Sequence, residues 1–386
     1  MKFEVKIMAS IVHRNNRFLV VHYEHDISGK NKQKWETYRT LADAKRRKAE
    51  IERRQELGAL DVPTCKTIND LLKEYISLYG KATWSLSVFS SNSRLIRNYI
   101  SPVIGKMDLC EISPRILEKY YQKLLQTPAV SRITQKRGTK DTGLVQPATV
   151  RKVHSLLRSA FNQAVKWELM EKNPAIHATV PKAVPQKREV WDAETIFLAL
   201  DVCDDARLKL AINLSFACSM RIGEILGLTW DCVDISPKSI AAGTASIMIE
   251  KELQRVDKTA MKSLEQKDVL FIFPQASKRN KTMLVLKKPK TESSIRKVFI
   301  PKTVARQLEA WKREQERTKE ALGDEYTDYN LVLAHGLGSP VEQSRITAMF
   351  QALIKKNDLP KVVFHSLRHS SITYKLQLTG GDIKSV

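Results

Sequence analysis

The chain has 386 residues, of which 42% are hydrophobic, and this predicts two or three globular domains instead of a disordered protein. Its 65 Lys and Arg outnumber its 42 Asp and Glu, which gives a net charge of +23. A surplus of that size repels itself in a compact fold, so it indicates a polyanionic partner. Nucleic acid is favoured over an anionic membrane surface, because the sequence has no basic amphipathic helix with a wide apolar face.

Targeting signals and metal motifs are not evident. The first ten residues lack the apolar core of a secretory signal, and no apolar run is long enough to cross a membrane, so we expect a cytoplasmic protein. The five cysteines are scattered and lack metal-ligand spacing, so we predict small buried thiols, no metal site and no cofactor: Cys65, Cys110, Cys203, Cys218 and Cys232.

Residues 1–62 have the pattern of a small α+β domain. Apolar and polar residues alternate over 9–38, with turn residues at Asn15-Asn16 and at 28–31, which predicts three strands. Thr40 and Asp43 form a capping-box pattern that opens a basic helix ending near Glu56.

Residues 63–180 are predicted to be all-α. Expected helices begin at Thr67, span 85–100, begin near Pro114, and span 147–171 with one apolar face. A basic, glycine-containing connection at 131–143 precedes the last of them.

Residues 181–386 mix both kinds of element. Helices are expected at 193–202, 205–218 and 223–228, strands at 246–249, 269–273, 283–286 and 296–300, and helix again near the end. Residues 251–300 hold 13 Lys and Arg against five Asp and Glu, a charge that suits a surface facing DNA.

Three separated segments of this last domain carry residues suited to phosphate chemistry. Arg221 opens a predicted helix with Glu224 one turn later, Lys290 precedes the strand at 296–300, and His365 and Arg368 share one face at the start of a helix. Two guanidinium groups bind the non-bridging oxygens of a phosphate bidentately, a lysine protonates a departing sugar oxygen, and a histidine exchanges a proton or binds the phosphate.

These residues resemble the signature boxes of the tyrosine recombinases. Arg221 with Gly223-Glu224 and Leu228-Thr229-Trp230 is similar to the first box, and His365 with Arg368-His369 is similar to the second. Lys290 resembles the β-hairpin lysine of the family. Landmarks of the family's helical domain also have counterparts, at 100–105 and at Asn173-Pro174.

The resemblance implies a multidomain α+β fold in three parts. Residues 1–62 would be an arm-binding cap of three strands and a helix, and 63–180 an all-α, SAM-like core-binding domain. Residues 181–386 would be a mixed, mainly α catalytic domain with a small antiparallel sheet.

The resemblance also implies site-specific recombination: integration or excision of a mobile element through a 3′-phosphotyrosyl intermediate. Arg221, Lys290, His365 and Arg368 would be catalytic. Partners would be core-type and arm-type DNA duplexes, three further copies of the chain in a homotetramer, and an accessory DNA-bending or excision factor, all in a bacterial cytoplasm. A type IB topoisomerase and a non-catalytic DNA-binding protein are the alternatives.

The sequence does not match the family pattern at every position. Ser219 stands where the family commonly has glycine, and Lys287 and Lys288 rival Lys290. The family's nucleophilic tyrosine follows the second box on a later segment, so we expect it beyond Val386, with the chain as printed inactive in cleavage. Tyr374 is predicted to pack in the core, and neither Tyr326 nor Tyr329 has a better claim to be the nucleophile. Arm-site contacts are expected on the cap sheet, from Arg14, Arg17, Lys32 and Lys34.

Overall fold

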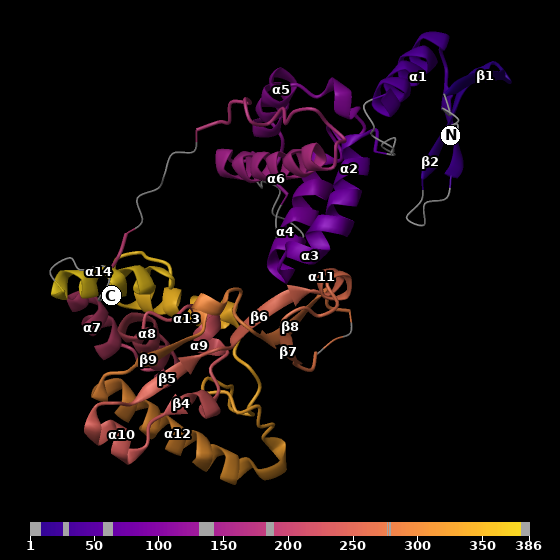
Figure 1. The fold of residues 1–386 in the computed structure, drawn as a ribbon. Helices are drawn as coiled ribbons and strands as arrows, with labels where there is room; N and C mark the ends of the chain where they lie inside the picture. The colour runs from indigo at the N-terminus through magenta and orange to yellow at the C-terminus, as the bar shows by residue number, and fades with distance from the viewer. Residues whose placement is uncertain are drawn as a thin grey trace. The chain divides into compact units, whose positions relative to one another are not determined.

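The structure is a computed structural model that describes residues 9–25, 31–56, 65–130, 143–182, 189–275, 277 and 279–379. Its contacts form two compact units, one of Met1–Ser77 with Leu95–Pro181 and one of Leu78–Arg94 with Lys182–Val386. Figure 1 colours the chain from indigo at its start to yellow at its end. The connection expected at 131–143, the linker before residue 65 and the final residues 380–386 lie almost wholly outside the described parts.

The first unit begins with the predicted three-stranded sheet and helix. Strands β1 (Ser10–Arg14), β2 (Arg17–His25) and β3 (Asn31–Tyr38) pair antiparallel in that order. Asn15 and Asn16 both have positive φ, as a two-residue hairpin turn requires. The side chain of Thr40 accepts a hydrogen bond from the backbone of Asp43 and so caps α1 (Leu41–Glu56), which packs on one face of the sheet through Val20, Ala44 and Ile51.

The all-α prediction for the next region is confirmed in its described residues, whose regular elements are helices. Thr67 and Asp70 form a capping box at α2, and Ser113 caps α5, whose first residue is proline. The α-helices are α2 (Ile68–Glu74), α3 (Lys81–Thr83), α4 (Leu86–Leu95), α5 (Pro114–Leu125) and α6 (Pro147–Lys166), with π-helical turns at Tyr75–Gly80 and Ile96–Ile100.

One helix end was predicted wrongly. Helix α6 ends at Lys166, five residues before the predicted end at Glu171. Glu168 has a φ of +59°, which a continuing right-handed helix cannot contain. The chain therefore turns before Asn173 and Pro174, the residues that were expected to stop it.

The second unit is mainly helical around two small sheets (Figure 1). Its helix α8 is central, because α7, α12, α13 and α14 all pack against it. Its α-helices after residue 182 are α7 (Ala193–Asp201), α8 (Ala206–Ala217), α9 (Ile222–Leu226), α10 (Pro237–Ala242), α11 (Lys258–Ser263), α12 (Lys302–Leu322), α13 (Gln343–Lys356) and α14 (Ser366–Leu378).

Two three-stranded antiparallel sheets take the place of the one small sheet that was predicted. The first has the order β4-β5-β9, from β4 (Val233–Asp234), β5 (Ser246–Ile249) and β9 (Arg296–Phe299). The second has the order β6-β8-β7, from β6 (Glu252–Asp257), β7 (Val269–Ile272) and β8 (Thr282–Lys287). Strand β6 was not predicted, because its buried residues Leu253 and Val256 are three apart and break the two-residue period of a strand.

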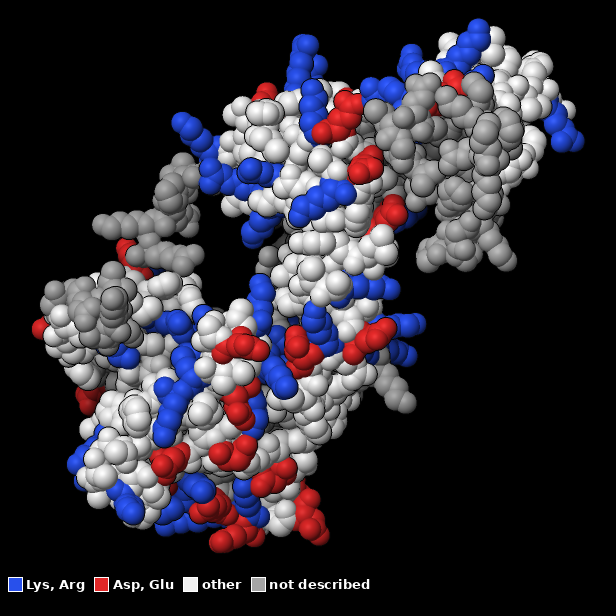
Figure 2. Space-filling view, viewed as in Figure 1, with Lys and Arg blue, Asp and Glu red and all other residues white. Residues whose placement is uncertain are grey.

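Basic side chains are spread over the face shown in Figure 2 instead of gathering in one patch. Among the described helices, none is long and apolar enough to pass through a bilayer.

Four cysteines are buried as predicted, but Cys110 is exposed, so the prediction of a buried thiol was wrong there.

Candidate active site

Arg221 lies at the junction between α8 and α9. Helix α8 ends in the core, Ser219 reverses the chain with a φ of +52°, and Arg221 then caps α9. The side chain of Glu224, only 2% exposed, accepts hydrogen bonds from the backbone N–H of Arg221 at 2.9 Å and from its Nη1 at 2.7 Å. The Arg221 side chain is about half exposed, at 47%, and so remains open to a ligand.

Arg368 approaches the same junction from α14. Its Nη1 donates a hydrogen bond to the backbone carbonyl oxygen of Ser219, two residues before Arg221. Burial lowers the pKa of Arg368, and the positive charges of Arg221 and Arg296 lower it further, while Glu224 opposes them. An arginine stays charged at any working pH, so Arg368 brings a second positive charge to the turn that precedes Arg221.

A third arginine, Arg296 at the start of β9, also binds Glu224. Its Nη2 donates to Glu224 Oε2 at 2.9 Å, and its Nη1 donates to Oε1 at 3.3 Å. Burial tends to raise the pKa of Glu224, but the hydrogen bonds from Arg296 and Arg221 outweigh it and lower this pKa. The carboxylate is therefore ionised and shared between two cations.

Ser219 is held by its side chain as well as by its backbone. Its Oγ lies 2.7 Å from the hydroxyl of Ser371 and accepts a hydrogen bond from Lys375 Nζ at 3.1 Å, both on α14. The left-handed φ explains why glycine suits this position, and the two polar contacts explain how a serine is tolerated here.

The histidines lie at the start of α14, as predicted. The rings of His365 and His369 meet edge to face with their centroids 5.0 Å apart. His365 is exposed and immediately precedes the helix, three residues before Arg368. This spacing places both side chains on one face.

The structure separates the three candidate lysines. Lys287 is 4% exposed and pairs with Glu252 at 2.8 Å, so its ammonium is occupied in the protein interior. Lys288 and Lys290 are exposed in the connection between β8 and β9, and Lys290 forms no ion pair within the described part of the chain. Accessibility thus favours Lys290 or Lys288 over Lys287.

The three tyrosines considered in the sequence have structural roles. Tyr374 packs against Phe216 in the core, with ring centroids 5.6 Å apart, which confirms the prediction. The hydroxyl oxygen of Tyr326 accepts a hydrogen bond from Gln315, and the ring of Tyr329 meets that of Phe273 edge to face.

The four cap residues predicted to contact DNA do not share one face of the sheet. Arg14 and Arg17 are exposed, pair across the hairpin, and alternate with the residues that face α1, so they lie on the outer face. Lys34 pairs with buried His22 on the α1 side. Lys32 belongs to β3, but its side chain lies outside the described parts. The outer face also presents Trp35, which is 54% exposed.

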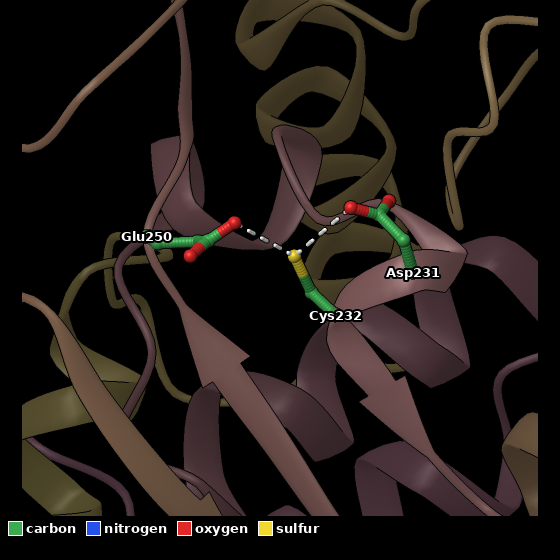
Figure 3. Close-up of side chains that lie close together, drawn as sticks. All are labelled: Asp231, Cys232 and Glu250. Carbon is green, nitrogen blue, oxygen red and sulfur yellow. Dashed lines mark hydrogen bonds between the residues drawn. The ribbon is translucent and has the colours of Figure 1, made fainter.

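One cluster has the spacing of a possible metal site. Ligand atoms of Asp231, Cys232 and Glu250 lie within 4.8 Å of one another, and the thiol donates toward both carboxylates (Figure 3). Lys251 Nζ lies 2.6 Å from Asp231 and 3.6 Å from Glu250. Burial raises the pKa of Cys232, which keeps the thiol protonated. Lys251 already forms ion pairs with both acids, so the cluster is best explained as a structural ion-pair network.

Sequence patterns missed part of this site. Arg296 was read only as the start of a strand, and Lys375 was not considered. Local sequence does not show which carboxylate or hydroxyl a basic residue will contact when the partner is distant. Arg296 is 72 residues from Glu224, and Lys375 is 156 residues from Ser219. Only the departure from glycine at Ser219 marked the neighbourhood as unusual.

Comparison with known proteins identifies the class. The model of the phage integrase family matches residues 190–386, just over half of the chain, and the chain therefore belongs to this family. The N-terminal SAM-like domain of phage integrases matches residues 67–125.

Two relatives and one solved structure illustrate the similarity. A tyrosine recombinase XerC-like protein of Caldanaerobacter subterraneus is 25% identical over 331 residues, covering 83% of this chain and 74% of the relative. The ICEBs1 integrase of Bacillus subtilis is 23% identical over 310 residues, covering 77% and 71%. The Tn1549 transposon integrase in complex with transposon right end DNA matches in fold with a TM-score of 0.61 and 17% identity, covering 83% and 89%.

Proposed function

We propose that this chain is the DNA-breaking and rejoining enzyme of a mobile element and performs site-specific recombination at the element's ends. The observation that carries the proposal is the convergence of Arg221 and Arg368 on the Ser219 turn, from segments about 150 residues apart. Two guanidinium groups in one place form a site for the non-bridging oxygens of a DNA phosphate.

Each of the four candidate catalytic residues has its own role in strand cleavage. Arg221 and Arg368 stabilise the negative charge that develops on the phosphate, and His365 accepts the proton of the attacking tyrosine or binds the phosphate. The tyrosine oxygen forms a bond to phosphorus, the bond to the 5′ oxygen breaks, and Lys290 protonates that oxygen. The phosphotyrosyl link retains the energy of the phosphodiester, so a 5′-hydroxyl from another duplex reverses the step and joins new strands.

Double-stranded DNA is the proposed partner at two kinds of site. The helical domain and the catalytic domain would hold the core-type site, and the cap would hold an arm-type site through Arg14 and Arg17 on its outer face, with Lys32 and Lys34 as weaker candidates. We further propose a homotetramer on two duplexes, assisted by an accessory DNA-bending or excision factor, in the bacterial cytoplasm. The DNA complex named for the Tn1549 integrase supports the choice of partner.

The nucleophile remains a prediction. Tyr374, Tyr326 and Tyr329 are engaged in packing or hydrogen bonds, so the proposal places the attacking tyrosine on a segment after Val386. The test uses two proteins, the 386-residue chain and the same chain extended at its C-terminus along its reading frame. Each is incubated with a nicked duplex of its recombination site. The extended chain should trap a covalent DNA adduct. Absence of any adduct would leave a non-catalytic DNA-binding protein.

Substitution of the arginines tests their role in the same assay. Arg221→Ala and Arg368→Ala in the extended chain should each slow adduct formation by about a thousandfold, while site affinity falls by less than about tenfold, because the charge they stabilise develops only in the transition state. Lys290→Ala should slow cleavage by about a hundredfold. Equal losses of binding and cleavage would show instead that the arginines have a structural role.

A further inference from the structure

The buried carboxylate of Glu224 is saturated by two arginines. Its Oε1 accepts from Arg221 Nη1 at 2.7 Å and from Arg296 Nη1 at 3.3 Å. Its Oε2 accepts from the backbone N–H of Arg221 at 2.9 Å and from Arg296 Nη2 at 2.9 Å. Four donors thus surround a group that is 2% exposed.

The charge balance around Glu224 indicates what Arg296 contributes to the site. If Arg221 were the only cation beside Glu224, the carboxylate would neutralise the guanidinium that must meet a phosphate, in a site where burial strengthens the interaction. With Arg296 present, the three groups together keep one positive charge. Arg221 can then attract an anion while Glu224 still fixes its position.

Arg296 also connects this ion cluster to the segment that bears Lys290. Its Nη1 donates at 3.1 Å to the backbone carbonyl of Ser294, the last residue of the short 3₁₀ turn Glu292–Ser294 between Lys290 and β9. Thr291 braces this turn through its hydroxyl, 2.9 Å from that of Ser294. A single side chain therefore links the connection that holds Lys290 to the helix that holds Arg221.

We propose that Arg296 is a positioning residue of the recombination site, which shares Glu224 with Arg221 so that Arg221 keeps its charge for the phosphate. This inference rests on the proposed function. Arg296 is not expected to touch DNA, because its guanidinium is committed to Glu224 and Ser294.

The test compares adduct formation by the C-terminally extended chain and its variants on the nicked duplex. Arg296→Met should lower the rate constant of adduct formation by about 10- to 100-fold and change duplex affinity by less than about threefold. In a Glu224→Gln background the same substitution should cost less than about threefold, since no carboxylate charge is left to balance. Arg296→Lys, which keeps the charge but loses the two-pronged contact, should react at an intermediate rate.

Arg313→Met is the matched control, since it removes another arginine–glutamate pair of the same unit, the exposed Arg313–Glu309 pair on α12. It should react like the unsubstituted chain. If the melting temperature shows that Arg296→Met does not fold, Arg296→Lys takes its place. Its rate of adduct formation is then compared with Glu224 unchanged and with Glu224→Gln. Two outcomes would overturn this inference and leave the proposed function standing, provided that the unsubstituted chain forms the adduct. One is an undiminished rate for Arg296→Met. The other is an equal loss of rate with and without the charge of Glu224. No adduct from the unsubstituted chain would overturn the proposed function as well.

Discussion

Ser219 sets the geometry of the site through one backbone angle. Its left-handed φ of +52° turns the chain between α8 and α9 and aims its carbonyl oxygen at Arg368. Such a conformation costs a non-glycine residue about 1 kcal/mol or more, which the side-chain contacts to Ser371 and Lys375 offset.

Replacing Ser219 in two ways separates these effects. Ser219→Ala keeps the strained angle and loses both polar contacts, so it should lower the free energy of unfolding by about 2 kcal/mol. Ser219→Gly loses the same contacts but relieves the strain, so it should be more stable than the alanine variant by about 1 kcal/mol. Urea unfolding of the whole chain measures both values, and an alanine variant as stable as the glycine variant would contradict the assigned strain.

At the scale of elements, an ion network fastens α1 to the cap sheet. Glu36 on β3 pairs with Arg47 of α1 at 3.1 Å and with Lys66 at 2.7 Å, and it accepts a hydrogen bond from Tyr38 at 2.5 Å. Burial by itself raises the pKa of Glu36, but the hydrogen bonds from Arg47, Lys66 and Tyr38 outweigh it and lower this pKa to about 2. Lys66 immediately precedes the helical region, so the network also joins the cap to the segment that follows it.

This network predicts an acid-sensitive contribution to stability. The pKa of Glu36 in the folded chain lies below its ordinary value of 4.5, so the stabilisation is complete above pH 4.5 and is lost as the pH falls toward 2. At pH 7, Glu36→Gln should reduce the free energy of unfolding by about 2 kcal/mol, allowing for solvent screening of Lys66. The difference between the two chains should shrink as unfolding is measured at lower pH. A difference that is constant from pH 7 to pH 3 would be inconsistent with an ionised, paired Glu36.

For the whole molecule, a net charge of +23 governs how it meets DNA. Each phosphate that a Lys or Arg neutralises releases counterions, so affinity falls with salt in proportion to the number of contacts. We expect the logarithm of the association constant to fall with the logarithm of salt concentration with a slope of about −6 or steeper. Fluorescence anisotropy with a labelled duplex measures this slope.

A pair of double variants localises the contribution of the cap to that slope. Arg14→Ala with Arg17→Ala should make it shallower by about 2, because both side chains lie on the outer face of the sheet. Lys45→Ala with Arg46→Ala removes the same charge from the exposed side of α1 and should leave the slope nearly unchanged. Equal effects would show that the cap contributes only its net charge.

The amino-acid sequence by itself determined the local features of this protein. The capping residues Thr40 and Thr67, the Asn15-Asn16 turn and the proline that opens α5 act through bonds within a few residues, and each prediction was confirmed. The separated boxes that contain Arg221 and Arg368 were also visible, since residue type and spacing suffice to predict phosphate chemistry.

Only the tertiary structure decided which distant groups meet. Strand β6 forms by pairing with β8, although its own pattern lacks strand periodicity, and Lys287 is withdrawn into a buried pair with Glu252. Arg296 joins Glu224 across 72 residues, and Lys375 joins Ser219 across 156. These contacts depend on how helices and sheets pack around α8, and the free energy of that packing is shared among many residues, so no short stretch of sequence encodes it.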